Sequence, residues 1–184
     1  MTEVFVTARL NAKLQPMHRG DVFEDPLNER LEQAGHGTIT GGGTQLAASG
    51  EVEYADLEVR LNAATDAVLD WLVAALEDLG APHGSQLLVG DAPPRVFGTV
   101  EGMGVYLNGT DLHADVYETC DSNAVYDALE SAVGERGHIY SYWQGPTETA
   151  LYLYGPSFDE MRALTAAFLA SYPLCARCRV VKIA

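Results

Sequence analysis

The sequence predicts an α+β protein made of two tandem copies of one folding unit. The order strand, helix, strand, strand, helix, strand can be traced from Val4 to Val89 and again from Val96 to Ile183. A Gly-His pair opens the second strand of both copies, at 35–36 and 137–138. A unit with this order forms a four-stranded antiparallel sheet with two helices on one face. Each sheet then has a helix-free face, where a function is expected.

The length of 184 residues fits two small domains. We expect one unit at residues 1–90 and the other at 95–184, joined by the Gly- and Pro-rich stretch 90–94. In the first copy, strict alternation from Val4 to Leu14 predicts a half-buried strand, and apolar residues at helical spacing predict the helices. The expected elements are strands at 4–14, 36–46, 54–61 and 85–89 and helices at 21–34 and 64–79.

The second strand of this copy contains the run Gly41-Gly42-Gly43. Glycine within a strand marks a bulge, a bend, or the close approach of another backbone or a ligand. A phosphate site is the weaker alternative, because the run has no P-loop lysine and no helix follows it. We therefore predict a bulge here and include Gly42 among the candidate binding residues.

In the second copy, a strand loosened by glycines is expected to begin at Arg95 and to bulge. Ser157 and Glu160 have capping-box spacing, which predicts the start of the last helix. The expected elements are strands at 95–107, 138–143, 147–154 and 177–183 and helices from 121 and from 157.

The two helix-free faces differ in chemistry. Alternation places Arg9 and Arg60 on that face of the first sheet. If Leu151 and Leu153 face the helices of the second copy, its tyrosines lie on the opposite, open side, where exposed aromatic rings favour binding. The candidate binding residues are Tyr140, Tyr142, Tyr152, Tyr154, Arg9, Arg60 and Gly42.

The charge balance narrows the choice of partner. With 26 acidic and 11 basic residues, the net charge is -15. Such a field repels phosphate backbones and attracts cations, so we expect no nucleic acid partner and favour a cationic protein. Solubility is a simpler explanation of the same acidity.

Three cysteines, without an N-terminal signal or a long apolar run, predict a cytoplasmic protein that does not span a membrane. Cys175 and Cys178 have the spacing of a redox or metal pair, but no second pair accompanies them. The histidines are dispersed; His36 and His138 are expected at matching positions of the two copies. No nucleophile, base and orienting acid can be grouped. We therefore predict no catalytic residues, no metal site and no cofactor, which favours a non-enzymatic protein.

The element order resembles tandem ferredoxin-like βαββαβ domains. Short stretches such as 14–17, 41–44 and 51–54, together with the acidic balance, resemble uncharacterised bacterial proteins of polymorphic-toxin immunity type. This resemblance covers mainly the first half and implies a non-catalytic inhibitor that meets a basic effector protein through tyrosine anchors. The alternative is small-ligand binding, or catalysis, in a cleft between the two sheets. A homodimer through the same faces also remains open.

Overall fold

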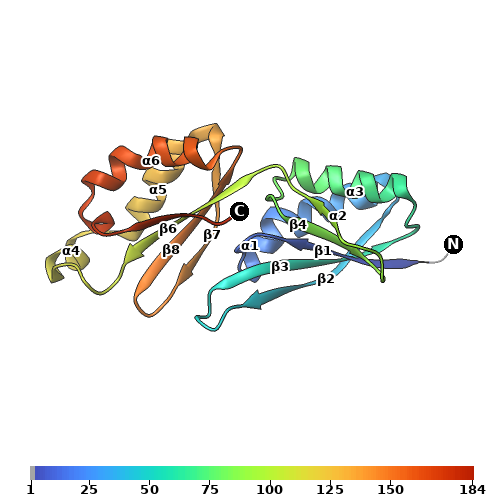
Figure 1. The fold of residues 1–184 in the computed structure, drawn as a ribbon, viewed down its shortest axis with the longest axis horizontal. Coiled ribbons are helices and arrows are strands. Elements are labelled where there is room, and N and C mark those ends of the chain that lie inside the picture. Colours follow the sequence, from blue (N-terminus) through green and yellow to red (C-terminus); the bar gives the residue numbers. More distant parts are fainter. Residues whose placement is uncertain (1–2) are drawn as a thin grey trace.

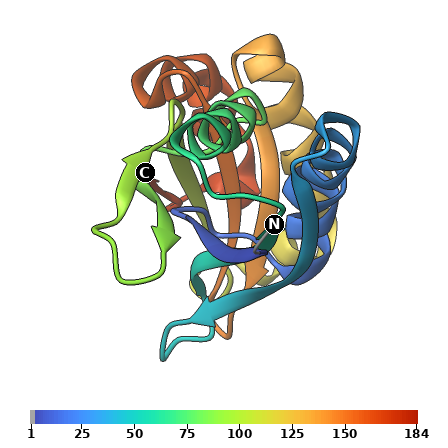
Figure 2. The same cartoon turned by 90° about the vertical axis from the view of Figure 1, so that its right-hand side faces the viewer.

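The computed structural model describes residues 3–184, which form two antiparallel sheets placed side by side along the long axis of the molecule (Figure 1). The helices of both units lie on the same side of the strands, as the view along that axis shows (Figure 2). The strand orders are β2-β3-β1-β4-β5 and β7-β8-β6-β9. Apart from the additional β5, both are the order of a ferredoxin-like unit, so the predicted fold class is confirmed.

The first unit begins with β1, whose alternating burial matches its alternating sequence. After it, one continuous helical stretch is formed by α1, the π-helical turn η1 and α2, and it ends at Gly35 in the left-handed conformation. Thr65 caps α3 by accepting from the backbone N–H of Val68. The elements are β1 (Val4–Leu10), α1 (Pro16–Arg19), η1 (Gly20–Glu24), α2 (Asp25–Ala34), β2 (Gly37–Leu46), β3 (Val52–Leu61), α3 (Asp66–Asp78), β4 (Ser85–Val89) and β5 (Arg95–Phe97).

The second unit repeats this order with a shorter connection after its second strand, 145–147 compared with 47–51 in the first unit. The Ser157 hydroxyl accepts from the Glu160 N–H at the start of the last helix, as the capping-box spacing predicts. The elements are β6 (Glu101–Asn108), α4 (Ala114–Thr119), α5 (Ser122–Val133), the 3₁₀ turn η2 (Gly134–Arg136), β7 (His138–Gln144), β8 (Glu148–Gly155), α6 (Phe158–Ser171), the 3₁₀ turn η3 (Pro173–Cys175) and β9 (Arg179–Lys182).

The boundary between the units lies later than residue 95. Arg95–Phe97 pairs with β4 and so belongs to the first sheet, and the second sheet starts only at Glu101. β6 pairs with β8 without a register shift, so the bulge expected in this strand is absent. The glycines of β6 are explained by neighbouring aromatic rings instead. A Cβ on Gly104 would lie 2.7 Å from the Tyr106 ring, and one on Gly102 would lie 2.8 Å from the Tyr154 ring, so glycine leaves the space that these tyrosines occupy.

Both units carry a bulge at the same place in their second strand. The register shifts between Ile39 and Gly41 in β2 and between Ile139 and Ser141 in β7. The bulge predicted for the glycine run therefore falls at its start. Aligning the copies on this bulge offsets the Gly-His pairs by two residues, so His36 and His138 are not matched. His36 packs edge-on against Trp71, whereas His138 is exposed beside Glu130.

The larger hydrophobic core crosses from one unit into the other. It contains the sandwich between the first sheet and its helices, and also Tyr106, Ala150, Tyr152 and Tyr154 of the second sheet. A smaller core lies between the second sheet and α5 and α6, and it contains Leu151 and Leu153 as the sequence predicts. Because one core is shared, the two units are packed together through apolar surface.

Gly98, between the two sheets, gives a test of this connection. Its φ is +112°, and a Cβ there would lie 1.9 Å from the carbonyl oxygen of Pro82. We predict that Gly98→Ala lowers the free energy of unfolding by about 2–3 kcal/mol, because strain and a backbone clash add together. Gly43→Ala is the matched control: no atom lies within 4 Å of its Cβ position, so the change should stay within about 0.5 kcal/mol. Urea unfolding measures both, and equal stabilities would contradict the prediction.

Candidate functional site

The tyrosine face of the second sheet is covered by the first unit. Tyr152 and Tyr154 are 0% and 1% exposed. The Tyr154 hydroxyl accepts from the backbone N–H of Lys13 at 2.8 Å, and the Tyr140 ring stacks on Tyr154 and meets Phe23 edge-on. The orientation deduced from the alternation is right, but the expectation of an open platform is wrong for these tyrosines. These tyrosines cover the apolar residues at the end of the first unit and form part of its hydrophobic core.

A bulge separates the tyrosine pair of β7. Tyr140 is the extra residue between Ile139 and Ser141. After it, each residue of β7 points to the face opposite to the one that simple alternation predicts. Ser141 and Trp143 face the first unit, where the Ser141 hydroxyl accepts from the Gln15 N–H at 3.1 Å. Tyr142 faces the helix side instead and remains 42% exposed. Tyr140 and Tyr142, expected on one face, therefore lie on opposite faces of the sheet.

The Glu51 carboxylate is the polar centre of the contact between the units. Its Oε1 accepts from the hydroxyls of Tyr106 and Tyr152 at 2.6 and 2.7 Å and lies 3.1 Å from the Lys13 ammonium. Burial raises the pKa of Glu51, but these three partners lower it by more, so it lies below its ordinary value. Burial and the carboxylate together raise the pKa of both tyrosines. Both phenols thus remain protonated donors.

The helix-free face of the first sheet remains open, as predicted. Arg9 forms a two-point ion pair with Asp56, with both distances 2.9 Å, and its guanidinium lies 4.1 Å from the centre of the Tyr54 ring. This pairing raises the pKa of Arg9. Arg60 pairs with Glu3 at 2.8 Å. The two arginines are therefore engaged by neighbouring carboxylates and do not converge with the tyrosines on one site.

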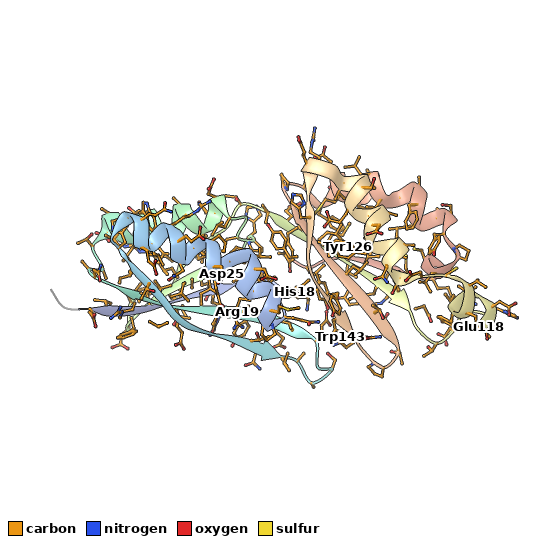
Figure 3. The ribbon with its side chains drawn as sticks, turned by 180° about the vertical axis from the view of Figure 1, so that it is seen from behind. His18, Arg19, Asp25, Glu118, Tyr126 and Trp143 are labelled. Atoms are coloured by element: carbon orange, nitrogen blue, oxygen red, sulfur yellow. The ribbon has the colours of Figure 1, made fainter. Side chains whose placement is uncertain are left out.

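A cleft between facing sheets, the alternative site, is not formed by residues 3–184. The second sheet meets the end of the first sandwich instead of its open face, and two cavities flank this junction. Figure 3 shows His18 and Arg19 of the first unit at the junction, near Trp143 and Tyr126 of the second.

The first cavity, of about 520 Å³, contains the predicted Gly42 in its wall. The Arg19 side chain is 10% exposed and bonds to Glu24 at 2.7 Å and to the Thr44 hydroxyl at 2.6 Å. A Cβ on Gly42 would lie 2.8 Å from the backbone oxygen of Asp56 and 2.4 Å from Glu24 Oε1, so a larger residue would crowd both the neighbouring strand and the ion pair. The cavity is lined by Gln15, Pro16, Arg19, Gly42, Gly43, Thr44, Leu46, Gly50, Val52 and Trp143.

The second cavity, of about 460 Å³, lies between the first turn of α5 and the outer ends of the second sheet. Tyr142 is the predicted residue that it contains. His18 closes it from the first unit and meets the Tyr142 ring edge-on, with 5.5 Å between ring centres. The lining residues are His18, Leu107, Ser122, Asn123, Tyr126, Tyr142, Gln144, Thr149 and Leu151.

The cysteines are free thiols. Burial raises the pKa of Cys175 to about 12 and raises that of Cys178 as well, which disfavours the reactive thiolate. No group of three or more His, Cys, Asp or Glu residues within 3–184 could hold a metal ion. None of the helices within 3–184 combines the length and the hydrophobicity that a membrane-spanning helix needs.

The sequence did not single out His18, Arg19, Tyr126 and Trp143, which line the cavities. Their positions depend on how the units dock, which no periodicity within one strand or helix encodes. Glu51 was not among the predicted site residues either, because it follows a turn at Ala48-Ser49-Gly50 and has the pattern of a solvated loop residue.

Comparisons with known proteins add no family. No family model and no curated protein matches the chain. Among solved structures, it is similar to the first two RRM domains of a yeast poly(U)-binding protein, at 12% identity, with 97% of this chain and 99% of that chain covered and a TM-score of 0.28. It is also similar to the aspartate kinase regulatory subunit of Thermus flavus, at 14% identity, 91% and 94% coverage and a TM-score of 0.30. These low scores carry no functional argument.

The Glu51 cluster predicts a pH-dependent stability. Because the pKa of Glu51 is lowered on folding, its contribution is present above the unfolded pKa of about 4.3 and is lost as the pH falls through the folded value. We expect Glu51→Gln to lower the free energy of unfolding by about 1–2 kcal/mol at pH 7, with a smaller loss below about pH 4. Urea unfolding across pH measures this. Exposed Glu53→Gln serves as control, and a loss for Glu51→Gln that does not change with pH would refute the assignment.

Proposed function

We propose that this chain is a non-enzymatic binding protein that adds an extended, cationic segment of a protein partner to the free edge of β2. The observation that carries this proposal is the 520 Å³ cavity beside β2, whose lining includes Gly42, Gly43 and Thr44 of that strand. An added strand gains main-chain hydrogen bonds from the edge, and alternate side chains of the segment enter neighbouring pockets.

β2 lies at one end of the five-stranded sheet, so one side of it has no partner strand. Its start is covered, because the Asn28 side chain accepts from the backbone N–H of Ile39 and from the Thr38 hydroxyl, both at 2.8 Å. From Gly41 to Leu46 the strand contains neither a charged residue nor a proline, two usual protections of an edge. Its pairing with β3 is regular from Gly41 to Gln45 and shifts before Leu46, so a regular stretch of five residues can accept another strand.

The other outer edges are better protected. β9 carries Arg179 and Lys182, and β5 carries Arg95. At β7, the Gln15 side-chain amide donates to the Tyr142 carbonyl at 2.6 Å, so part of that edge is occupied by the first unit. Among the described strands, β2 offers an uncharged stretch beside a cavity.

Carboxylates on either side of β2 favour a cationic segment. Asp21 and Asp25 are exposed on η1 and α2, the helical stretch that packs beside β2, and exposed Glu58 lies next to Gly41 on the other face. Lysine or arginine side chains alternating along an added strand would meet these groups. A second copy of the chain would bring a further charge of -15 to the same place, which opposes a homodimer at this edge.

The resemblance to polymorphic-toxin immunity proteins supports the same kind of partner, a basic effector protein that is bound and not chemically changed. In the proposal the anchors are different from those expected of that resemblance. The buried tyrosines hold the two units together, and the main chain of β2, with Leu46 and Trp143 beside it, contacts the partner.

The test uses a synthetic peptide, acetyl-(Lys-Val)₃-amide, and hydrogen exchange. We expect those amides of β2 between Gly41 and Leu46 that point away from β3 to exchange about tenfold more slowly with saturating peptide, because added-strand hydrogen bonds protect them. Gly43→Lys should abolish this protection, since it places a positive charge on the edge, while Gly43→Ala should keep it.

Two control peptides separate strand addition from charge attraction. The same peptide N-methylated at every residue cannot donate main-chain hydrogen bonds from either edge, and the (Glu-Val)₃ peptide has the opposite charge; neither should protect β2. Equal protection by the glutamate peptide, or protection confined to β1 and β3, would show that the proposed edge is not the docking site.

A further inference from the structure

The cavity between α5 and the second sheet differs from its surroundings in charge. One residue in five of the whole chain is charged, yet none of the nine residues that line this cavity is an aspartate, glutamate, lysine or arginine. An ionic ligand would lose hydration here without a countercharge in return. The cavity therefore favours a neutral ligand.

Its walls supply aromatic faces over an apolar floor. Tyr126 and Tyr142 are 38% and 42% exposed, so their rings keep accessible surface at the cavity. Leu107 and Leu151 come from adjacent strands of the sheet beneath. Planar heterocycles stack favourably on such tyrosine faces.

Polar groups are distributed around these rings. Asn123 and Gln144 each carry an amide donor and an amide acceptor, and Ser122 and Thr149 add hydroxyls. A side-chain amide can pair in two points with a ring edge that presents a donor next to an acceptor. Neither amide makes a side-chain hydrogen bond among the described residues; the Asn123 contact is through its backbone N–H, to Asp121.

His18 contributes an imidazole ring from the first unit. Its Nδ1 lies 2.8 Å from the Ser141 hydroxyl, and that oxygen also accepts from the Gln15 N–H. The docking of the two units thus positions the ring of a residue in the cavity wall.

A smaller cavity lies next to this one. It has a volume of about 190 Å³, shares Leu107, Ser122 and Thr149 in its lining, and is also lined by Tyr117 and Leu174. A neutral substituent on the ring would have this neighbouring space available.

We propose that this cavity is a binding site for a neutral planar heterocycle with a donor–acceptor edge, the chemistry of a nucleobase or an uncharged nucleoside. Tyr142 and Tyr126 stack against the ring, and Asn123 and Gln144 pair with its edge. The net charge of -15 and the uncharged lining disfavour the corresponding nucleotides. This site is independent of the proposed strand addition at β2.

The test measures binding of four nucleosides, adenosine, guanosine, cytidine and uridine, to the full chain by saturation-transfer NMR and by isothermal titration. We expect at least one nucleoside to bind, and its monophosphate to bind at least about tenfold more weakly, since the phosphate is repelled. The free bases distinguish a base site from one that also needs the ribose.

Matched variants locate the site. Tyr142→Ala and Asn123→Ala should each weaken binding by about tenfold or more, whereas Tyr54→Ala, an aromatic change on the open face of the first sheet, should have no effect. Both ring and amide lie at the surface, so the variants should keep their far-UV circular dichroism and melting temperature. The proposal would be overturned if none of the four nucleosides bound, or if glucose bound and the nucleosides did not. It would also be overturned if a monophosphate bound as tightly as its nucleoside, or if Tyr142→Ala left nucleoside binding unchanged.

Discussion

The structure depends on burial of the helix-free face of the second sheet against the end of the first unit. Tyr106, Tyr152 and Tyr154 bring large rings into a shared core, and their hydroxyls would be costly to bury without partners. Glu51 and the backbone N–H of Lys13 supply those partners. Since the Glu51 carboxylate is itself compensated by Lys13, removing any one member leaves a polar group unsatisfied in a mostly apolar contact. This cluster fixes how the two units sit together.

The same contact explains why two similar units have different surfaces. In the second sheet, Gly102 and Gly104 of β6 lie opposite Tyr154 and Tyr152 of β8, so each large ring has a small residue beside it and the face can pack closely. In the first sheet, the equivalent face carries Arg9, Asp56 and Arg60, which pair with neighbours in water. One helix-free face has become an interior and the other a surface. Duplication of a fold therefore did not produce two copies of one site.

Much of the architecture could be predicted because it depends on local alternation. Val4, Val6 and Ala8 of β1 and Leu151 and Leu153 of β8 face the side that their period of two indicates. The bulge at Tyr140 could not be deduced in this way, because an extra residue changes which face follows it, and nothing in the string Tyr140-Ser141-Tyr142 marks the change. The burial of the tyrosine face could not be predicted either, because alternation shows which residues share a face but not what packs against that face. His18 and Trp143 acquire their roles only through contacts across more than a hundred residues of sequence.

Both candidate cavities depend on docking instead of on either unit alone. The short helix α1 contributes His18 to one and Arg19 to the other, and residues of β7 complete them with Tyr142 and Trp143 on opposite faces of the same strand. The bulge at Tyr140 is what sends those two side chains in opposite directions, so a local irregularity in one strand divides the junction into an uncharged cavity and one beside the free edge. The hydrogen bonds of Gln15 to Ser141 and to the Tyr142 carbonyl hold α1 at this point. Weakening the Glu51 cluster should therefore disturb both sites, because each takes one lining residue from the other unit, His18 in one and Trp143 in the other.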